Sequence, residues 1–120
     1  SEGIESVLRE ISNQFVDHGT DLHLSLDVDG VDPEFFPSTG TPVLGGLSLC
    51  EVSRVIQFLN SNYDLISFDL VELNPFLGNS RDQLLSLNNS LELLKVLTAR
   101  HDNNLNYTLI KDDLIYHNHI

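Results

Sequence analysis

Residues 22–29 decide the fold and read LHLSLDVD. Leucine or valine occupies every second position of this stretch, and polar residues lie between them. A period of two is that of a β-strand with one apolar face and one polar face. A second run, residues 65–73, is apolar on both faces apart from Ser67, Asp69 and Glu72. We therefore predict two strands, the second of them buried on both sides, as in the middle of a parallel sheet.

Three segments with helical periodicity flank these strands. Apolar residues recur every three or four positions over residues 2–17, 48–60 and 80–100, which is the spacing of one helix face. Residues 30–47 are rich in Gly, Pro, Ser and Thr and are expected to form a loop. Strands that alternate with helices of this length predict an α/β fold, with a parallel sheet and right-handed crossovers.

The starts of the second and third helices carry capping signals. Ser48 is followed three residues later by Glu51, and Ser80 is followed by Gln83. In a capping box each of the two side chains accepts a hydrogen bond from the backbone amide of the other residue. We therefore expect both pairs to cap their helices. Residues 107–110, beyond the third helix, are expected to form a short strand or a tail that packs elsewhere.

The composition excludes some classes of partner. The formal net charge is −12, with 18 acidic against 6 basic residues, and such a surface repels the phosphates of nucleic acid. No apolar run approaches the ~20 residues that a membrane helix needs. Cys50 is the only cysteine, which fits a reducing compartment. We expect a cytoplasmic protein with no nucleic-acid or membrane partner, and an organelle is the alternative location.

Two aspartates at the end of the first strand point to a cation. Ligand sites of parallel sheets lie beyond the carboxyl ends of the strands, which directs attention to Asp27, Asp29 and Glu72. The period of two should send Asp27 and Asp29 to the same side of the strand. Their repulsion would be relieved by a hard divalent cation such as Mg²⁺, Ca²⁺ or Mn²⁺. The alternative is a solvated turn, which these two residues alone favour, because Asp-Gly and Asp-Pro are common turn pairs.

Longer motifs carry a resemblance to a known family. SLDVDGVDP (residues 25–33) resembles the ureohydrolase signature S-x-D-x-D-x-x-D-P, and PSTGTP (37–42) and GGL (45–47) continue it. DLVELNP (69–75) is similar to the D-x-x-E-x-N-P segment of the same superfamily. The match runs from about residue 22 to residue 100. Within the superfamily, the Asn-Pro pair and the Leu-Gly pair that follows it look more like arginase than agmatinase.

The resemblance implies a fold and a domain organisation. Members of this superfamily have a three-layer α/β/α fold, in which a parallel sheet has helices on both faces. This chain would hold only part of it. We therefore expect residues 1–120 to form the C-terminal part of a single ureohydrolase catalytic domain, with the N-terminal part absent. Such a part should expose apolar surface where the missing strands belong.

The resemblance also implies roles for single residues. Asp27 matches the aspartate that bridges two manganese ions, and Asp29 matches one that binds a single ion. Glu72 matches the glutamate that pairs with the guanidinium group of the substrate, while a bridging hydroxide hydrolyses arginine to ornithine and urea. Thr41 matches a position on the loop that lines the substrate site, and Asp32 is expected to brace that loop. For Glu72 the alternative is a structural ion pair with an arginine such as Arg54 or Arg81.

The chain lacks other parts of the family pattern. The G-G-D-H and D-A-H-x-D segments, which supply the remaining manganese ligands, do not occur in it. We therefore expect those ligands to come from the remainder of the ureohydrolase fold, and the chain alone to be inactive. We also expect a homo-oligomer. The alternatives are an enzyme acting on agmatine or another guanidino compound, and a non-catalytic arginase-like module or subunit.

Overall fold

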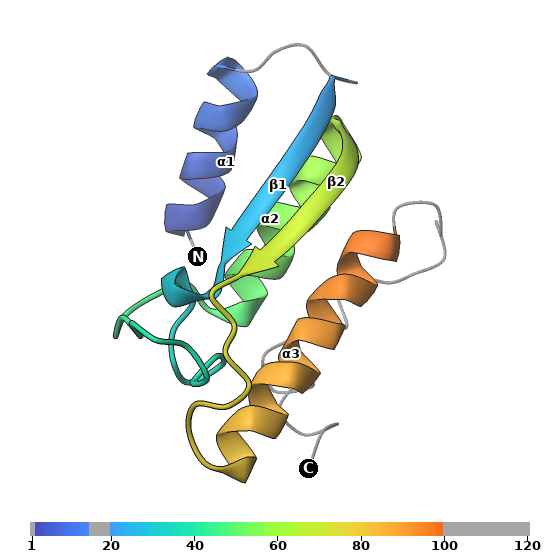
Figure 1. Cartoon of the computed structure of the whole chain (residues 1–120). Coiled ribbons are helices and arrows are strands. Elements are labelled where there is room, and N and C mark those ends of the chain that lie inside the picture. Colours follow the sequence, from blue (N-terminus) through green and yellow to red (C-terminus); the bar gives the residue numbers. More distant parts are fainter. Residues whose placement is uncertain (1, 15–19, 100–120) are drawn as a thin grey trace.

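A two-stranded parallel sheet organises the part of the chain that the computed structural model describes, residues 2–14 and 20–99 (Figure 1). Strand β1 spans Asp21–Asp27 and strand β2 spans Asp64–Val71. The prediction of two adjacent parallel strands is therefore confirmed. Because the strands run in the same direction, their carboxyl ends meet at one edge of the sheet, which is the lower edge in Figure 1.

Three helices accompany the sheet: α1 (Glu2–Gln14), α2 (Leu49–Asn62) and α3 (Ser80–Thr98). Each matches a predicted helix, with ends that differ by a few residues. The last predicted residues of the first helix, 15–17, and the predicted segment 107–110 lie outside the described residues. No helix in the described ranges is long and apolar enough to span a membrane.

The crossover helix α2 lies behind both strands in Figure 1. Its start is the predicted capping box. The Glu51 amide donates to the Ser48 hydroxyl oxygen at 3.1 Å, and the Ser48 amide donates to the Glu51 carboxylate at 3.0 Å. An ion pair of 2.6 Å between Arg54 Nε and Glu5 Oε1 joins α2 to α1. Both side chains are 42% exposed, so we assign the pair little stabilising effect.

The apolar core lies on the α2 side of the sheet. The strands contribute partly buried leucines to it, Leu24 and Leu26 from β1 and Leu70 from β2. The fully packed members come from the loop after β1 and from α2 and α3: Val28, Val31, Phe35, Phe36, Leu49, Val52, Ile56, Leu93 and Val96. The core therefore reaches from the sheet to the loop that follows β1, and it fixes the base of that loop.

The capping box predicted for α3 is wrong by one residue. The Asp82 amide donates to Asn79 Oδ1 at 2.8 Å, and the Asn79 amide donates to Asp82 Oδ2 at 3.1 Å, in place of the predicted pair Ser80 and Gln83. Asn and Ser cap helices about equally well, so the sequence alone does not choose between them. Gly78, with a left-handed φ of 83°, directly precedes the cap residue Asn79.

The leucines that predicted α3 stay largely at the surface. Four of them, on one side of the helix, are 42–56% exposed: Leu84, Leu87, Leu91 and Leu94. The opposite side of α3 is more polar and buried. There the Asn89 side chain donates to the Phe35 carbonyl at 2.9 Å, and the Ser86 hydroxyl accepts from the Ser38 amide at 3.1 Å. Polar bonds thus attach α3 to the loop after β1.

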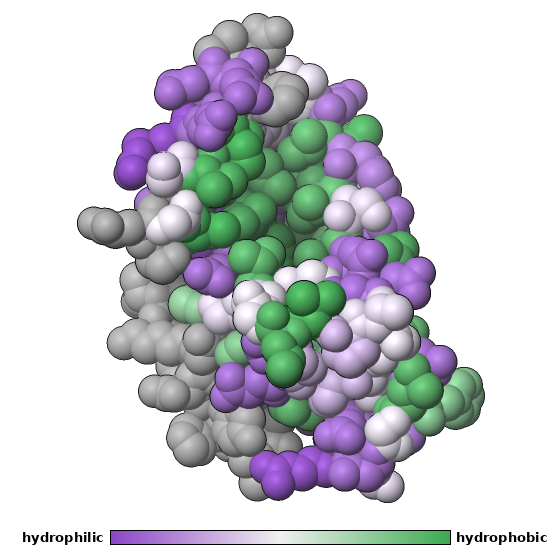
Figure 2. Space-filling view, turned by 90° about the vertical axis from the view of Figure 1, so that its left-hand side faces the viewer, coloured by the Kyte–Doolittle hydropathy of each residue, from purple (hydrophilic) through white to green (hydrophobic). Residues whose placement is uncertain are grey.

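One expectation for β2 is contradicted in this chain. The strand is not buried on both sides, because Ile66 is 62% exposed and no described helix covers the face of the sheet opposite α2 (Figure 1). Exposed apolar side chains also occur on α1 and on the loop before α2, where Leu44 is 86% exposed. Figure 2 shows such apolar surface on the side of the molecule at the left of Figure 1. The α/β fold is therefore present with helices on one face of its sheet.

Candidate metal and substrate site

Asp27 and Asp29 lie at the carboxyl end of β1, on either side of a change in backbone geometry. Asp27 is the last residue of the strand, and the 3-10 helix η1 (Val28–Gly30) begins directly after it. Asp27 Oδ1 accepts a hydrogen bond from the Asp29 amide at 2.9 Å. The prediction that Asp29 continues the alternation of the strand is therefore wrong, because Asp29 belongs to the helical turn. The two residues stay adjacent through the cap that Asp27 provides.

Two threonines hold the Asp29 carboxylate. The hydroxyl of Thr39 donates to Oδ1 and the hydroxyl of Thr41 donates to Oδ2. These bonds, with Thr39 the larger cause, lower the pKa of Asp29 below its ordinary value, although partial burial acts in the opposite direction. Hydrogen bonds to the charged form of a carboxyl favour ionisation. The two hydroxyl groups therefore favour the charged form of Asp29.

Sequence reasoning included Thr41 in the site but missed Thr39. Thr39 is 5% exposed, whereas Thr41 is at the surface. Both belong to the motif PSTGTP, so the signal was present. Without coordinates, however, nothing distinguishes a hydroxyl that points at Asp29 from one that points at solvent.

Glu72 follows the carboxyl end of β2 and is close to the same loop. Its carbonyl oxygen lies 2.9 Å from the Thr39 hydroxyl, and Thr39 forms an antiparallel bridge with Leu73. Glu72 has a left-handed φ of 65°, which is costly for a residue with a side chain. The predicted extent of the second buried strand, to residue 73, is wrong at this end, because β2 ends at Val71 and Glu72 is exposed.

The structural ion pair considered for Glu72 is absent. Among residues 2–14 and 20–99, no ion pair involves its carboxylate, and Arg54 pairs with Glu5. The sheet edge thus brings Asp29 and the backbone of Glu72 together through Thr39. Within residues 2–14 and 20–99, the Glu72 side chain is exposed beside them.

Asp32 braces the loop that carries the threonines, as expected. Its Oδ1 accepts from the Glu34 amide and its Oδ2 accepts from the Gly45 amide, both at 2.9 Å. The base of the loop is closed by backbone bonds of 2.9 Å in both directions between residues 30–32 and Leu47. Gly46 is packed so tightly there that a Cβ atom would lie 2.7 Å from the Gly30 carbonyl oxygen.

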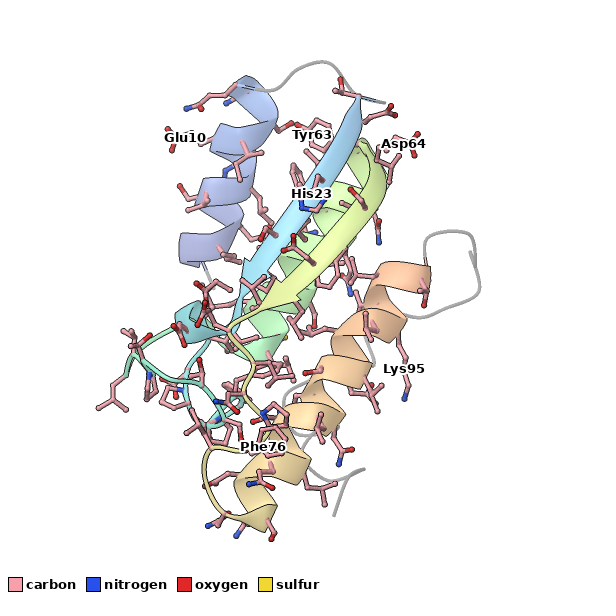
Figure 3. The ribbon with its side chains drawn as sticks, in the orientation of Figure 1. Glu10, His23, Tyr63, Asp64, Phe76 and Lys95 are labelled. Carbon is pink, nitrogen blue, oxygen red and sulfur yellow. The ribbon has the colours of Figure 1, made fainter. Side chains whose placement is uncertain are left out.

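A second polar cluster lies on the open face of the sheet. His23 Nδ1 is 2.6 Å from Ser67 Oγ, and His23 Nε2 is 3.1 Å from Asp69 Oδ2. The Ser25 hydroxyl donates to Asp69 Oδ1. The Ser25 bond is the largest cause that lowers the pKa of Asp69, and the His23 ring adds to it, while partial burial opposes both. Figure 3 shows His23 on the side of β1 that faces away from α2.

The donor atoms at the sheet edge fit part of a manganese site. Aspartate carboxylates are hard oxygen ligands, which suit Mn²⁺ and similar cations. Within the described ranges, however, no group of three or more His, Cys, Asp or Glu side chains is placed to hold a metal ion. If a metal ion binds here, Asp27 and Asp29 are the two carboxylates at this end of the sheet that would hold it.

A sequence model of the Arginase family matches residues 1–94. The chain belongs to the arginase family. Its relatives include the arginase of Emericella nidulans, which is 47% identical over 74 residues, covering 62% of this chain and 21% of that protein. Arginase-1 of Mus musculus is 45% identical over 69 residues, with coverages of 58% and 21%. The chain thus spans about a fifth of the length of these arginases.

Solved structures of the family have the same fold. The arginase of Entamoeba histolytica, in complex with L-ornithine, superposes with a TM-score of 0.68 at 35% identity, covering 80% of this chain and 31% of that one. The agmatine ureohydrolase of Thermoplasma volcanium gives 0.64 at 28% identity, with coverages of 98% and 33%. The predicted arginase-like α/β class is therefore confirmed, and the chain contains about a third of that fold.

Proposed function

We propose that residues 1–120 form the C-terminal part of a single ureohydrolase catalytic domain, which hydrolyses arginine to ornithine and urea with two manganese ions. The observation that carries the proposal is the arrangement at the sheet edge. Asp27, Asp29 and Glu72 follow the carboxyl ends of two adjacent parallel strands, where ligand sites of such sheets lie. The related arginase of Entamoeba histolytica was solved with L-ornithine, and this supports the amino-acid substrate.

In this proposal Asp27 and Asp29 hold the metal pair. Asp27 is exposed at the strand end and would hold both ions, while Asp29 would hold one of them. When bound, manganese makes a coordinated water acidic enough to ionise near neutral pH. Thr39 and Thr41 keep Asp29 in its charged form and fix its orientation, since each hydroxyl donates to one carboxylate oxygen.

Glu72 accepts the guanidinium group. A carboxylate binds this planar cation through two parallel hydrogen bonds, which also fix its orientation. The Glu72 side chain is exposed at the sheet edge among the described residues, which leaves it accessible to a substrate from this part of the chain. Thr41, on the exposed part of the loop, contributes to the wall of the same site. In this proposal two carboxylates, Asp27 and Asp29, would bind the metal ions, and the third, Glu72, would bind the substrate.

The remainder of the ureohydrolase fold completes the structure. The uncovered sheet face, the exposed Ile66 and the leucines of α3 provide surfaces for further strands and helices or for a second copy in a homo-oligomer. We keep the cytoplasm as the proposed location. The chain by itself should form no urea, because two carboxylates cannot hold two ions firmly. Manganese-dependent urea release by the purified 120-residue chain would contradict this expectation.

The metal assignment is tested in the complete protein that contains this chain. Asp27→Asn should reduce bound manganese and turnover more than Asp29→Asn does, because the amide removes a charge shared by both ions. Added manganese should restore part of the activity of both variants. Metal content and urea formation are measured on the same preparations. Unchanged manganese content in both variants would eliminate Asp27 and Asp29 as ligands.

Agmatine or another guanidino compound is the second candidate substrate. The agmatine ureohydrolase of Thermoplasma volcanium aligns with 98% of this chain, a larger share than the Entamoeba arginase does. Arginine differs from agmatine by its α-carboxylate, so the two are distinguished by comparing kcat/KM for both substrates in one preparation. A preference for arginine supports the first candidate, and a preference for agmatine replaces it with the second.

A further inference from the structure

The Thr39 hydroxyl has one proton to donate but lies close to two acceptor oxygens. Its oxygen is in hydrogen-bond contact with Asp29 Oδ1 and lies 2.9 Å from the Glu72 carbonyl oxygen. Both neighbours are acceptors, and a hydroxyl has a single proton to donate. At any moment, therefore, only one of the two contacts is a hydrogen bond. While the carboxylate is charged and carries no cation, it is the stronger acceptor, so the proton points at Asp29.

The position of the Thr39 side chain is fixed by its burial and by the hydrogen bonds of its neighbour Ser38. Thr39 is 5% exposed, and the neighbouring Ser38 is completely buried. Ser38 is held on three sides, because its hydroxyl donates to the Leu77 carbonyl at 2.8 Å, its amide donates to Ser86 Oγ at 3.1 Å and its carbonyl accepts from the Asn74 amide at 2.9 Å. The Thr39 oxygen is thus fixed between the two acceptors, and only its proton is free to rotate.

We propose that Thr39 is a positioning residue that couples cation binding at Asp29 to the backbone of Glu72. This proposal rests on the function proposed above. With a cation bound, the lone pairs of the Asp29 carboxylate would be shared with the cation and its charge would be neutralised, so the carboxylate would become the weaker acceptor for the Thr39 proton. The Thr39 proton then turns to the Glu72 carbonyl and stabilises the left-handed backbone there. The guanidinium-binding carboxylate is thereby fixed only after the metal has bound.

The coupling has a definite direction and size. Binding of a cation tightens the segment at Glu72, and by thermodynamic linkage an ordered Glu72 strengthens cation binding by the same factor. One hydrogen bond exchanged in a protein corresponds to about a five-fold change in an equilibrium constant. Thr41 provides a matched control, because it donates to Asp29 and has no hydrogen bond to Glu72 among the bonds of the described residues.

Hydrogen exchange of the segment 72–77 tests the coupling in the complete protein, with and without saturating Mn²⁺. The reporter is the Asn74 amide, which is bonded to the Ser38 carbonyl. Manganese should slow its exchange about five-fold in the unmodified protein, in Thr39→Ser, which keeps the hydroxyl, and in Thr41→Val. It should leave exchange unchanged in Thr39→Val, which has nearly the same shape. Thr39→Val should also show a raised KM for the guanidino substrate, and Thr39→Ser should restore the KM of the unmodified protein.

The possible outcomes separate the two proposals. The coupling is wrong, and the proposed function stands, if the protein binds manganese and forms urea but manganese slows exchange in Thr39→Val as much as in the unmodified protein. The coupling is also wrong, and the proposed function also stands, if manganese binds but does not slow hydrogen exchange in the unmodified protein. If Thr39→Ser behaves like Thr39→Val, the role of the hydroxyl is wrong. A protein that binds no manganese at all overturns the proposed function and the coupling together.

Discussion

Asp29 and Asp69 have similar partners and very different surroundings. Both oxygens of the Asp29 carboxylate accept a hydrogen bond from a hydroxyl group, and so does one oxygen of the Asp69 carboxylate. These bonds are the largest causes that lower the pKa of each residue. Asp69 and His23 are 47% and 52% exposed on the open sheet face. Asp29, at the sheet edge, is held by the buried Thr39, which also touches the backbone of Glu72.

The difference shows which part of the chain fixes its own geometry. Exposed polar pairs such as His23 and Asp69 contribute little to stability, because water competes for the same groups. A hydrogen bond made by a buried residue such as Thr39 restricts both segments that it joins. The sheet edge is therefore organised by residues within this chain, whereas the sheet face takes its final surroundings from whatever covers it.

The largest expected effect is at Glu72, on the organised edge. Glu72→Gln keeps the shape of the side chain but removes the charge that favours a guanidinium cation. The lost charge-assisted bonds should cost roughly 2–4 kcal/mol of transition-state stabilisation, which is roughly a 30- to 1000-fold fall in kcat/KM. Arginine turnover is measured in the complete protein, together with bound manganese and melting temperature.

The same preparation provides the control for Glu72→Gln. Manganese content and melting temperature should change little, because Glu72 is assigned to the substrate and has no ion pair among residues 2–14 and 20–99. Near-normal turnover would contradict the assignment. Lost activity that follows lost manganese would also contradict it, and would move Glu72 into the metal site.

An intermediate effect is expected at the base of the loop. In Gly46→Ala the new Cβ would meet backbone atoms of Gly30 and Asp32 at 2.7 and 2.8 Å, so the backbone bonds that close the loop must shift. We expect a loss of about 2–3 kcal/mol in the free energy of unfolding, measured by denaturant titration. Gly40→Ala is the matched control, because no atom lies within 4 Å of its Cβ position. Equal stability of the two variants would show that the loop tolerates the displacement.

The smallest effect is expected on the open sheet face. Ser25→Ala removes the largest cause of the lowered pKa of Asp69, so that pKa should rise toward its ordinary value. Because the pKa is lowered in the folded state, the stabilisation by Asp69 is present above the unfolded pKa and is lost as the pH falls through the folded pKa. NMR titration of the Asp69 carboxyl carbon measures the change. An unaltered pKa in Ser25→Ala would show that the hydroxyl is not the cause.

Much of the fold could be predicted because its signals are local. Alternating leucines identify β1, and the pair Ser48 and Glu51 identifies the start of α2, since each depends on residues within one turn or one strand. The start of α3 could not be chosen, because Asn79 and Ser80 are both good caps. The exposure of Ile66 could not be predicted either, since it lies where the register of the two strands shifts, between the pairs Leu22–Leu65 and His23–Ser67.

The site could be predicted as a set of residues but not as an arrangement. The motifs identified Asp27, Asp29 and Glu72, and the parallel strands bring their ends to one edge. The turn of η1 after Asp27 replaces the strand period that the alternating pattern predicted, and the left-handed backbone of Glu72 lies against the distant Thr39 hydroxyl. The part of Thr39 follows from the bridge to Leu73, a contact across more than thirty residues of sequence.

The backbone at Glu72 implies a trade-off between stability and function. A side chain in the left-handed region costs about 1–2 kcal/mol, and glycine would remove that cost at the expense of about 0.5–1 kcal/mol from its greater freedom when unfolded. Selection for stability alone would therefore favour glycine at residue 72. The chain instead has a glutamate there. On the function proposed here, the protein gives up some folding free energy to present the carboxylate that would bind the guanidinium group.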